Sequence, residues 1–230
     1  MIKKAVLSSS LAALAIGTAS AAIVLPVGIE GHHQGDSTSG DGSVVRAIDL
    51  SGITQVNPTD PGTWTHSNAW QDDWQGFNAN FADPNANFAV IDLGGPTADL
   101  ETMYLWNVNE GNHTARGVQD FEIFYAVTPS VLPGATSGTN QTYDFTSGGW
   151  TQLGGTFTLT QGTGVAGLTP DSFDVTAAGG AQYIGLRLNS YYANDSNRVG
   201  FSEVVFTTIP EPGSVALLLV GLAGLVRRRR

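Results

Sequence analysis

Tryptophans, carboxylates and amides are crowded into one long stretch of this chain, residues 54–87. A sugar ring packs its apolar face on an aromatic ring, while its hydroxyl groups bond to carboxylates and amides. The stretch therefore has the residue types of a carbohydrate-binding surface, although tryptophans that plug the end of a β-sandwich core would give the same pattern. The candidates for ligand contact are Trp64, Trp70 and Trp74, with Asp72 and Asp73 beside them.

A second group of the same kind lies further along the chain. Trp106 and Asn107 are followed closely by His113 and Arg116. The amide, imidazole and guanidinium groups would donate hydrogen bonds to sugar hydroxyls, and the indole would supply a flat apolar face. We expect these four residues to line the same ligand-binding surface, with burial in the core as the alternative for the tryptophan.

The sequence lacks the usual arrangements of catalytic residues. It has no serine nucleophile motif, no His-x-x-x-His pair on a helix and no glycine-rich phosphate loop. It also has no cysteine, which excludes thiol nucleophiles, thiolate metal sites and disulfides. Carboxylate pairs such as Asp72 and Asp73 are abundant, but a catalytic pair needs a raised pKa in a cleft. We therefore expect a non-catalytic protein.

Short β-strands are the elements that would position these side chains. Apolar residues alternate with polar ones, as at Met103 and Leu105, and Gly, Asn, Asp, Pro and Thr clusters separate the runs. Many short strands at this spacing are typical of an antiparallel sandwich or barrel. The expected strands are Val44–Leu50, Phe88–Leu93, Glu101–Val108, Asp120–Val127, Thr151–Leu159, Ser172–Val175, Tyr183–Leu188 and Gly200–Thr207.

Both ends of the chain have the composition of targeting segments. Residues 1–21 combine two lysines, an apolar run and a small-x-small cleavage site, which predicts a secretory signal peptide. Residues 210–230 run from Pro-Glu-Pro through an apolar stretch to four arginines, which stay on the cytoplasmic side of a membrane. The apolar stretch Gly213–Val226 would form about 21 Å of helix, against a bilayer core of about 30 Å. A span this short suits a temporary hold in the membrane.

The exported part, residues 22–209, is strongly acidic. It contains four arginines and no lysine against nineteen Asp and Glu residues, for a net charge of −15. Such a body repels nucleic acid and anionic lipid surfaces. Neutral ligands and divalent cations remain possible partners, whereas nucleic acid is excluded.

The C-terminal segment resembles the PEP-CTERM sorting signal of Gram-negative bacteria. The resemblance rests on Pro210, Glu211 and Pro212, the apolar stretch and the basic end. It implies an inner-membrane intermediate, processing near these three residues by an exosortase-type membrane protease, and a final place at the envelope surface or outside the cell. Proteins with this signal are associated with exopolysaccharide production, which implies extracellular polysaccharide or biofilm as a partner.

Six segments resemble, in order, the motifs of discoidin-type domains, the coagulation-factor C-type branch of the galactose-binding-like folds. The resemblance covers most of residues 22–209 and implies an antiparallel jelly-roll β-sandwich of about eight strands. The six segments are Ala47-Ile48-Asp49 with Thr54, Ala89–Gly94, Arg116–Ile123, Trp150, Ala181–Leu186 and Phe201–Val204.

The same resemblance implies a structural calcium ion. In that family an early aspartate loop and a closing glutamate share the ion, and they correspond here to Asp49 and Glu203, with Ala47 and Thr54 as further oxygen donors. Calcium takes six to eight hard oxygen ligands, so these residue types fit. Leu50 stands where the family has glycine. A turn cap at Asp49 and an arginine partner for Glu203 would explain both residues without a metal.

These features together predict an exported, non-catalytic protein of the cell surface or extracellular matrix, associated with exopolysaccharide. A carbohydrate-binding module for a neutral glycan is the first alternative. A glycan-acting enzyme, which would need carboxylates converging in a cleft, is the second.

Overall fold

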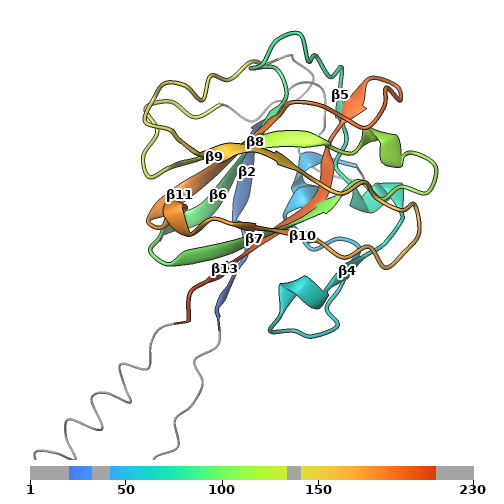
Figure 1. The fold of residues 1–230 in the computed structure, drawn as a ribbon, viewed down its shortest axis with the longest axis horizontal. Helices are drawn as coiled ribbons and strands as arrows, with labels where there is room; N and C mark the ends of the chain where they lie inside the picture. The colour runs from blue at the N-terminus through green and yellow to red at the C-terminus, as the bar shows by residue number, and fades with distance from the viewer. Residues whose placement is uncertain (1–20, 33–41, 134–140, 211–230) are drawn as a thin grey trace, which may run out of the picture. The chain divides into compact units, whose positions relative to one another are not determined.

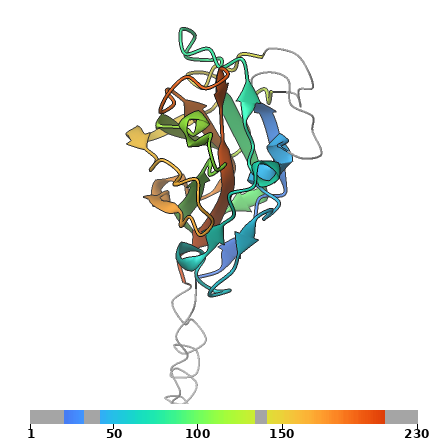
Figure 2. The same cartoon turned by 90° about the vertical axis from the view of Figure 1, so that its right-hand side faces the viewer.

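The chain folds as an antiparallel β-sandwich (Figures 1 and 2). The computed structural model describes residues 21–32, 42–133 and 141–210. In these ranges it contains thirteen strands and five short 3₁₀ turns, and no α-helix. None of the helical segments in this part is long and apolar enough to cross a bilayer. The predicted signal peptide up to Ser20 and the apolar tail, with Glu211 and Pro212, lie outside the described residues.

Two main sheets face each other, and two small strand pairs lie beside them. The four-stranded sheet has the order β1 (Ile23–Val24), β13 (Phe201–Thr208), β7 (Leu100–Asn107) and β10 (Asp171–Asp174). The five-stranded sheet has the order β2 (Gly28–His32), β6 (Phe88–Thr97), β11 (Ala181–Leu188), β8 (Asp120–Ala126) and β9 (Thr151–Thr158). The small pairs are β12 (Arg198–Val199) with β5 (Gly76–Phe77), and β3 (Ile53–Thr54) with β4 (Thr65–His66).

The main core lies between the two sheets because their strands alternate inward and outward residues. Met103 and Leu105 of β7 belong to one buried cluster with Phe121 and Ile123 of β8. Each side chain of this size contributes about 1.5–3 kcal/mol when it is fully buried. The core therefore holds the sandwich together in a chain without disulfides.

A second apolar cluster covers the other face of the five-stranded sheet. Phe88, Val90 and Phe124 alternate with core residues on their strands, and Phe145, from the loop before β9, packs on them. The rings of Phe124 and Phe145 are stacked with centroids 4.8 Å apart. Phe145 also lies directly over Gly185, where an added Cβ would be 2.2 Å from its Cε1 atom. Glycine in the middle of β11 is what allows this ring to reach the sheet.

Seven of the eight expected strands are confirmed, and one expectation is wrong. Val44–Leu50 forms a 3₁₀ turn over Val44–Ala47 and then a loop. Val44 and Ala47 are its buried residues, a spacing of three that suits a 3₁₀ turn and not the alternation of a strand. Leu50 then takes a positive φ of 61°, which ends any extended conformation. The very short strands, such as β1 and β12, gave no periodic signal to detect.

The two ends of the sandwich domain lie side by side. Residues 21–209 form one compact unit, in which β1 pairs with β13. The Thr208 amide donates to the Ala22 carbonyl oxygen (2.9 Å), and the Ile209 amide donates to the Asp99 carbonyl oxygen (2.7 Å). Pro210 follows at once and has no amide hydrogen, so the hydrogen-bonding pattern ends there.

Candidate functional site

Three loops at one end of the sandwich are fastened together by the buried side chain of Asn109. Its Nδ2 atom donates to the carbonyl oxygens of Ser67 and Val165 (both 2.8 Å). Its Oδ1 atom accepts from the amides of Thr163 (3.0 Å) and Gly164 (2.9 Å). Every hydrogen-bonding group of the side chain is used, so the loops are held in fixed positions.

Four charged or titratable side chains meet on these loops: Glu110, His113, Arg116 and Asp195, which we call the surface cluster. The Arg116 guanidinium lies between the carboxylates of Glu110 (3.1 Å) and Asp195 (3.1 Å). His113 Nδ1 is 2.5 Å from Asp195 Oδ2. Gln75 completes the cluster, because its Nε2 donates to Glu110 (2.8 Å) and its Oε1 accepts from Arg116 (2.9 Å).

The surface cluster is only partly exposed. The side chain of His113 is 38% exposed and that of Asp195 is 25% exposed, whereas that of Arg116 is 9% exposed. The hydrogen bond from His113, supported by Arg116, lowers the pKa of Asp195 to about 2. Asp195 is therefore a permanent acceptor, and the cluster offers fixed donors and acceptors to a polar ligand.

The backbone around Arg116 explains how the cluster is positioned. Arg116 ends the 3₁₀ turn η4 (Thr114–Arg116), and its carbonyl oxygen accepts from the Gly200 amide (3.2 Å), just before β13. An added Cβ at Gly200 would lie 2.0 Å from the Trp74 carbonyl oxygen, so only glycine allows the chains to come this close.

Three of the four predicted ligand-binding tryptophans are core residues, which corrects the sequence prediction. Trp64, Trp74 and Trp106 are each no more than 1% exposed, so they have no face to offer a sugar. Trp64 donates to the Asn57 carbonyl oxygen (2.6 Å), and Trp74 meets Phe201 edge-on. These large rings fill the ends of the sandwich, as the alternative interpretation expected.

Trp70 is different because its side chain reaches the solvent. It begins the 3₁₀ turn η3 (Trp70–Asp72) and is 49% exposed. This turn belongs to the same loop that Asn109 fastens through Ser67. Trp70 is therefore the one tryptophan of the four with a free face in the part of the chain that the structure describes.

Asn107 is also an internal residue and not a ligand contact. It is 2% exposed, and its Nδ2 donates to the carbonyl oxygens of Val118 (2.8 Å) and Thr160 (2.9 Å). Its Oδ1 accepts from the Val108 amide (2.9 Å). The residue fastens β7 to its neighbours, which corrects its assignment to the binding surface.

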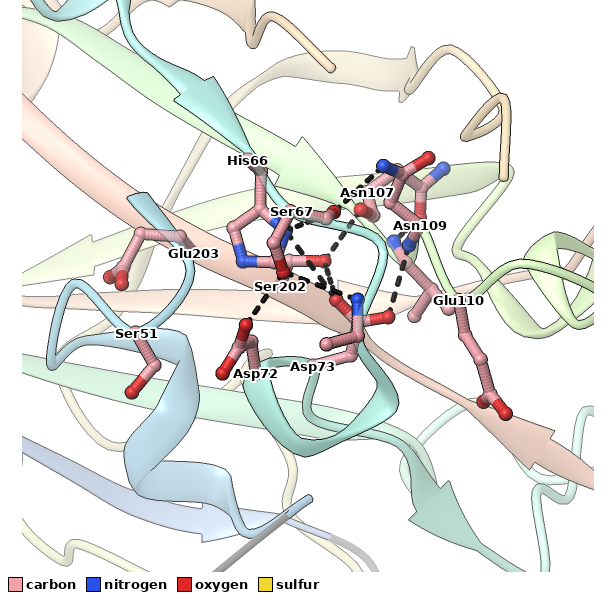
Figure 3. A network of polar contacts seen from close by, with 12 residues as sticks. Ser51, His66, Ser67, Asp72, Asp73, Asn107, Asn109, Glu110, Ser202 and Glu203 are labelled. Carbon is pink, nitrogen blue, oxygen red and sulfur yellow. Dashed lines mark hydrogen bonds and ion pairs between the residues drawn. The ribbon is translucent and has the colours of Figure 1, made fainter. Parts of the chain in front are cut away.

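A buried polar network lies behind these loops (Figure 3). Asp73 is completely buried, its Oδ2 accepts from the Asn109 amide (3.1 Å), and its Oδ1 is 2.5 Å from Ser202 Oγ. Burial raises the pKa of Asp73 to about 7, against the opposing effect of its hydrogen bonds. Burial lowers the pKa of His66, whose Nδ1 donates to the Ser67 carbonyl oxygen (3.0 Å) and lies 3.7 Å from Asp73.

This network brings a serine, a histidine and an aspartate together, but it is not placed for catalysis. The Ser202 hydroxyl bonds to Asp73 and to the Asn107 carbonyl oxygen rather than to the histidine. Ser202, His66 and Asp73 are each no more than 1% exposed. A nucleophile must reach its substrate, so the network serves the fold.

Glu203, the closing glutamate of the predicted calcium pair, is completely buried. Its carboxylate accepts from the amides of Leu50 (2.6 Å) and Val204 (3.2 Å). Burial raises the pKa of Glu203 well above its usual value, and the nearby charge of Asp49 raises it further. The two residues that the sequence paired are thus brought near each other, and Glu203 has no arginine partner within the described ranges.

The other predicted calcium ligands fit less well. Asp49 accepts from Arg46 (2.9 Å) and from the Ser51 amide (2.8 Å), so its oxygens are already engaged. Ala47 is buried at the end of a 3₁₀ turn, and Thr54 is exposed in β3. No group of three acidic or histidine side chains able to hold a metal occurs among the described residues. Glu203 suits a hard cation, whereas Asp49 would first have to leave Arg46.

Sequence reasoning missed Gln75 and Asp195 of the surface cluster. Asp195 lies 79 residues from Arg116 along the chain, and no local pattern links the two. Only the fold brings β12 and the loop before it against η4.

Residues 208–230 match the PEP-CTERM protein-sorting motif. The chain carries a PEP-CTERM sorting signal. The motif begins at Thr208, the last residue of β13, so the signal starts where the sandwich ends. A PEP-CTERM signal marks an exported protein of the Gram-negative cell surface that is processed by an exosortase. No protein of curated function matches the sequence.

Several solved structures are similar to this chain at low identity. A CBM32 domain of a GH31 protein, bound to GalNAc, is 14% identical over 81% of this chain and 97% of that one, with a TM-score of 0.41. An F5/8 type C domain from Bacteroides fragilis is 11% identical over 84% and 97%, with a TM-score of 0.45. A SusE-like protein is 17% identical over 77% and 94%, with a TM-score of 0.46. Likenesses this remote say nothing about a ligand of this chain.

Proposed function

We propose that this chain is a non-catalytic surface protein that contacts a neutral glycan outside the cell. The observation that supports the location is the sorting motif at residues 208–230. Intact mass spectrometry of the protein from envelope and medium tests the processing. We expect a product that has lost Arg227–Arg230 and begins near Ala22, and a product that keeps the four arginines would contradict the proposal.

The surface cluster supports glycan binding. Glu110, His113 and Asp195 present carboxylate and imidazole groups at the surface, and Arg116 holds them in place. Sugar hydroxyl groups both donate and accept, so they match a mixed set of this kind. Trp70, exposed on an adjoining loop, is the candidate for packing against a sugar ring.

The charge of the domain favours a neutral glycan over an anionic one. Residues 22–209 carry a net charge of −15, which repels uronates and sulfated sugars. The four arginines of this part are all engaged within the molecule, so they are not free to bind an anion. They are Arg46 with Asp49, Arg116 with Glu110 and Asp195, Arg187 with Glu122, and Arg198 on the ring of Phe77.

The pKa values and burial of the carboxyl groups favour glycan binding over glycan hydrolysis. A glycosidase needs an acid with a raised pKa beside the substrate. Asp195, which the solvent reaches, has its pKa lowered to about 2. Asp73 and Glu203, whose pKa values are raised, are completely buried.

The test is binding to neutral oligosaccharides by a glycan array followed by calorimetry. We expect His113→Ala to weaken binding at least several-fold, because it removes the most exposed donor of the cluster. Val56→Ala, a change at an exposed site away from these loops, is the matched control. Equal affinity of the two variants would contradict the surface cluster as the binding site, and no binding to any glycan would leave a structural matrix protein as the function.

A structural calcium ion at Glu203 and Asp49 is a second, separate proposal. It is supported by the buried carboxyl group of Glu203, which accepts from two amides and has no cationic side-chain partner among the described residues. Because burial raises the pKa of Glu203, an ion bound there would displace a proton and would tie the loop at Leu50 to β13. The calcium ion would stabilise the fold and would not contact the glycan.

A further inference from the structure

β9 is a long edge strand of the five-stranded sheet. It is the last strand in the order of that sheet and pairs only with β8. It is eight residues long, and its side chains are exposed apart from Leu153 and the half-buried Phe157. In the ranges that the structure covers, no backbone partner occupies its outer side. A row of free amide and carbonyl groups can pair with another strand.

The other three sheet edges are protected in the ways usual for monomeric proteins. β1 has only two residues. β10 has four residues and begins and ends with aspartate. β2 has five residues. Shortness and charge both discourage pairing with a foreign strand, and β9 has neither safeguard.

The charge pattern of the chain singles out the same edge. The stretch from Phe145 to Pro170 contains no charged residue, although residues 22–209 carry a net charge of −15. Two copies of so acidic a body repel each other over most of their surfaces. β9 adds no charge of its own to this edge, and the nearest carboxylates, Asp120 and Glu122 of β8, are bonded to Thr158 and Gln152. Two copies can therefore approach here with less repulsion than over the rest of the surface.

From these observations we propose that two copies of this chain associate through β9. The strands pair antiparallel across a two-fold axis, which joins the two five-stranded sheets into one continuous sheet. Antiparallel pairing of identical strands is self-complementary, as a two-fold interface requires. Thr156 and Thr158 lie on the face of β9 away from the core and form side-chain contacts across the pair, where threonine pairs are favourable.

A β-bulge sets a limit on this interface. The register of β9 against β8 shifts opposite Glu122 and Ile123, where Gly154 has a φ of 60° and Gly155 follows. The shift bends the strand and leaves three-residue segments on either side for pairing. The dimer interface is therefore small, as in weak and reversible protein complexes.

Sedimentation velocity of the mature protein isolated from its host, over a wide concentration range, tests the proposal without any glycan. We expect a monomer–dimer equilibrium. Thr156→Glu places like charges next to the two-fold axis and weakens association by about tenfold or more. Ser172→Glu makes the same change on the exposed edge of β10 and leaves association unchanged. Wild-type protein that stays monomeric throughout, or a dimer equally strong in both variants, overturns the proposal.

Hydrogen exchange gives an answer that does not depend on either variant folding. Amides of residues 151–158 in the wild-type protein are expected to exchange more slowly at high than at low protein concentration. Amides of β10 serve as the internal reference and should show no such change. Protection of β9 that is independent of concentration would contradict pairing between copies.

Discussion

The Ser202 hydroxyl lies 2.5 Å from the Asp73 carboxylate and 2.6 Å from the Asn107 carbonyl oxygen. A hydroxyl has one hydrogen, so it cannot serve two acceptors fully. If Asp73 is protonated, it donates to Ser202, which passes its own hydrogen on to Asn107. Every group is then satisfied, and this agrees with the raised pKa of Asp73. The buried carboxyl group acts as a neutral donor at the centre of the network.

The free energy of unfolding should therefore depend on pH through Asp73. The native state keeps this proton up to a pH of about 7, whereas the unfolded chain releases it near pH 3.8. The stabilisation is complete below pH 3.8 and is lost as the pH rises to about 7, by about 4 kcal/mol in all. The side chain of the Asp73→Asn variant cannot ionise. Urea unfolding should therefore show that the free energy of unfolding of the variant rises relative to that of the wild type between pH 5 and pH 8.

Other titratable groups near Asp73 also make the free energy of unfolding depend on pH. Glu203, with a raised pKa, changes stability in the same direction, and Glu110 faces Asp73 with a like charge. The pKa of His66 is lowered in the fold, so its contribution to the free energy of unfolding is lost as the pH falls below 6.5. His66 therefore changes stability in the opposite direction to Asp73. The contribution of Glu203 is common to both proteins and cancels in the difference, whereas those of His66 and Glu110 are coupled to Asp73 and change with the substitution. An equal gap between variant and wild type at both pH values would show that Asp73 is not protonated in the fold.

The contact of Phe145 with Gly185 gives a prediction about packing. An added Cβ at Gly185 would lie 2.2 Å from the ring, so Gly185→Ala should displace the loop and cost roughly 1–3 kcal/mol. Gly155→Ala is the control, because an added Cβ there meets nothing within 4 Å. Denaturant unfolding measures both. In the background Phe145→Ala, the effect of Gly185→Ala should largely disappear, and two additive effects would argue against the clash.

Substitution of a buried tryptophan should cost more free energy of unfolding than substitution of an exposed one. Trp74→Ala removes a fully buried ring and should cost about 3–5 kcal/mol of unfolding free energy. Trp70→Ala removes a half-exposed ring and should change stability by less than about 1 kcal/mol. If glycans bind as proposed, Trp70→Ala should nevertheless lose affinity. Similar losses of stability for the two variants would contradict the assignment of Trp74 to the core and Trp70 to the surface.

Calcium, if bound at Glu203, should raise the melting temperature. A cation that binds only the folded state stabilises it in proportion to its occupancy. The melting temperature should be higher in calcium than in chelator for the wild type, and the difference should vanish in Glu203→Gln. An identical melting temperature for the wild type in both solutions would exclude the ion.

The strands were predictable where alternation was visible, as in β7 and β8, because the period of two survives in any half-buried strand. The sorting signal was predictable because its order of residue types is local. Which tryptophans are buried could not be predicted, because Trp70 and Trp74 have similar neighbours in sequence. Only the packing of Phe201 against one of them decides which is buried. Asp195 could not be paired with Arg116 for the same reason, since their contact depends on tertiary structure.

β13 connects the loop end of the sandwich to the tail. Trp74 bonds to Phe201 at its start, and Ala22 bonds to Thr208 at its end. If a glycan binds at the surface cluster as proposed while the tail is held, a force between the two would run along this strand. Hydrogen bonds to β1 and β7 lie across that direction, so they resist sliding together and do not open one at a time. The order of strands in the sheet thus predicts resistance to a mechanical force applied along β13.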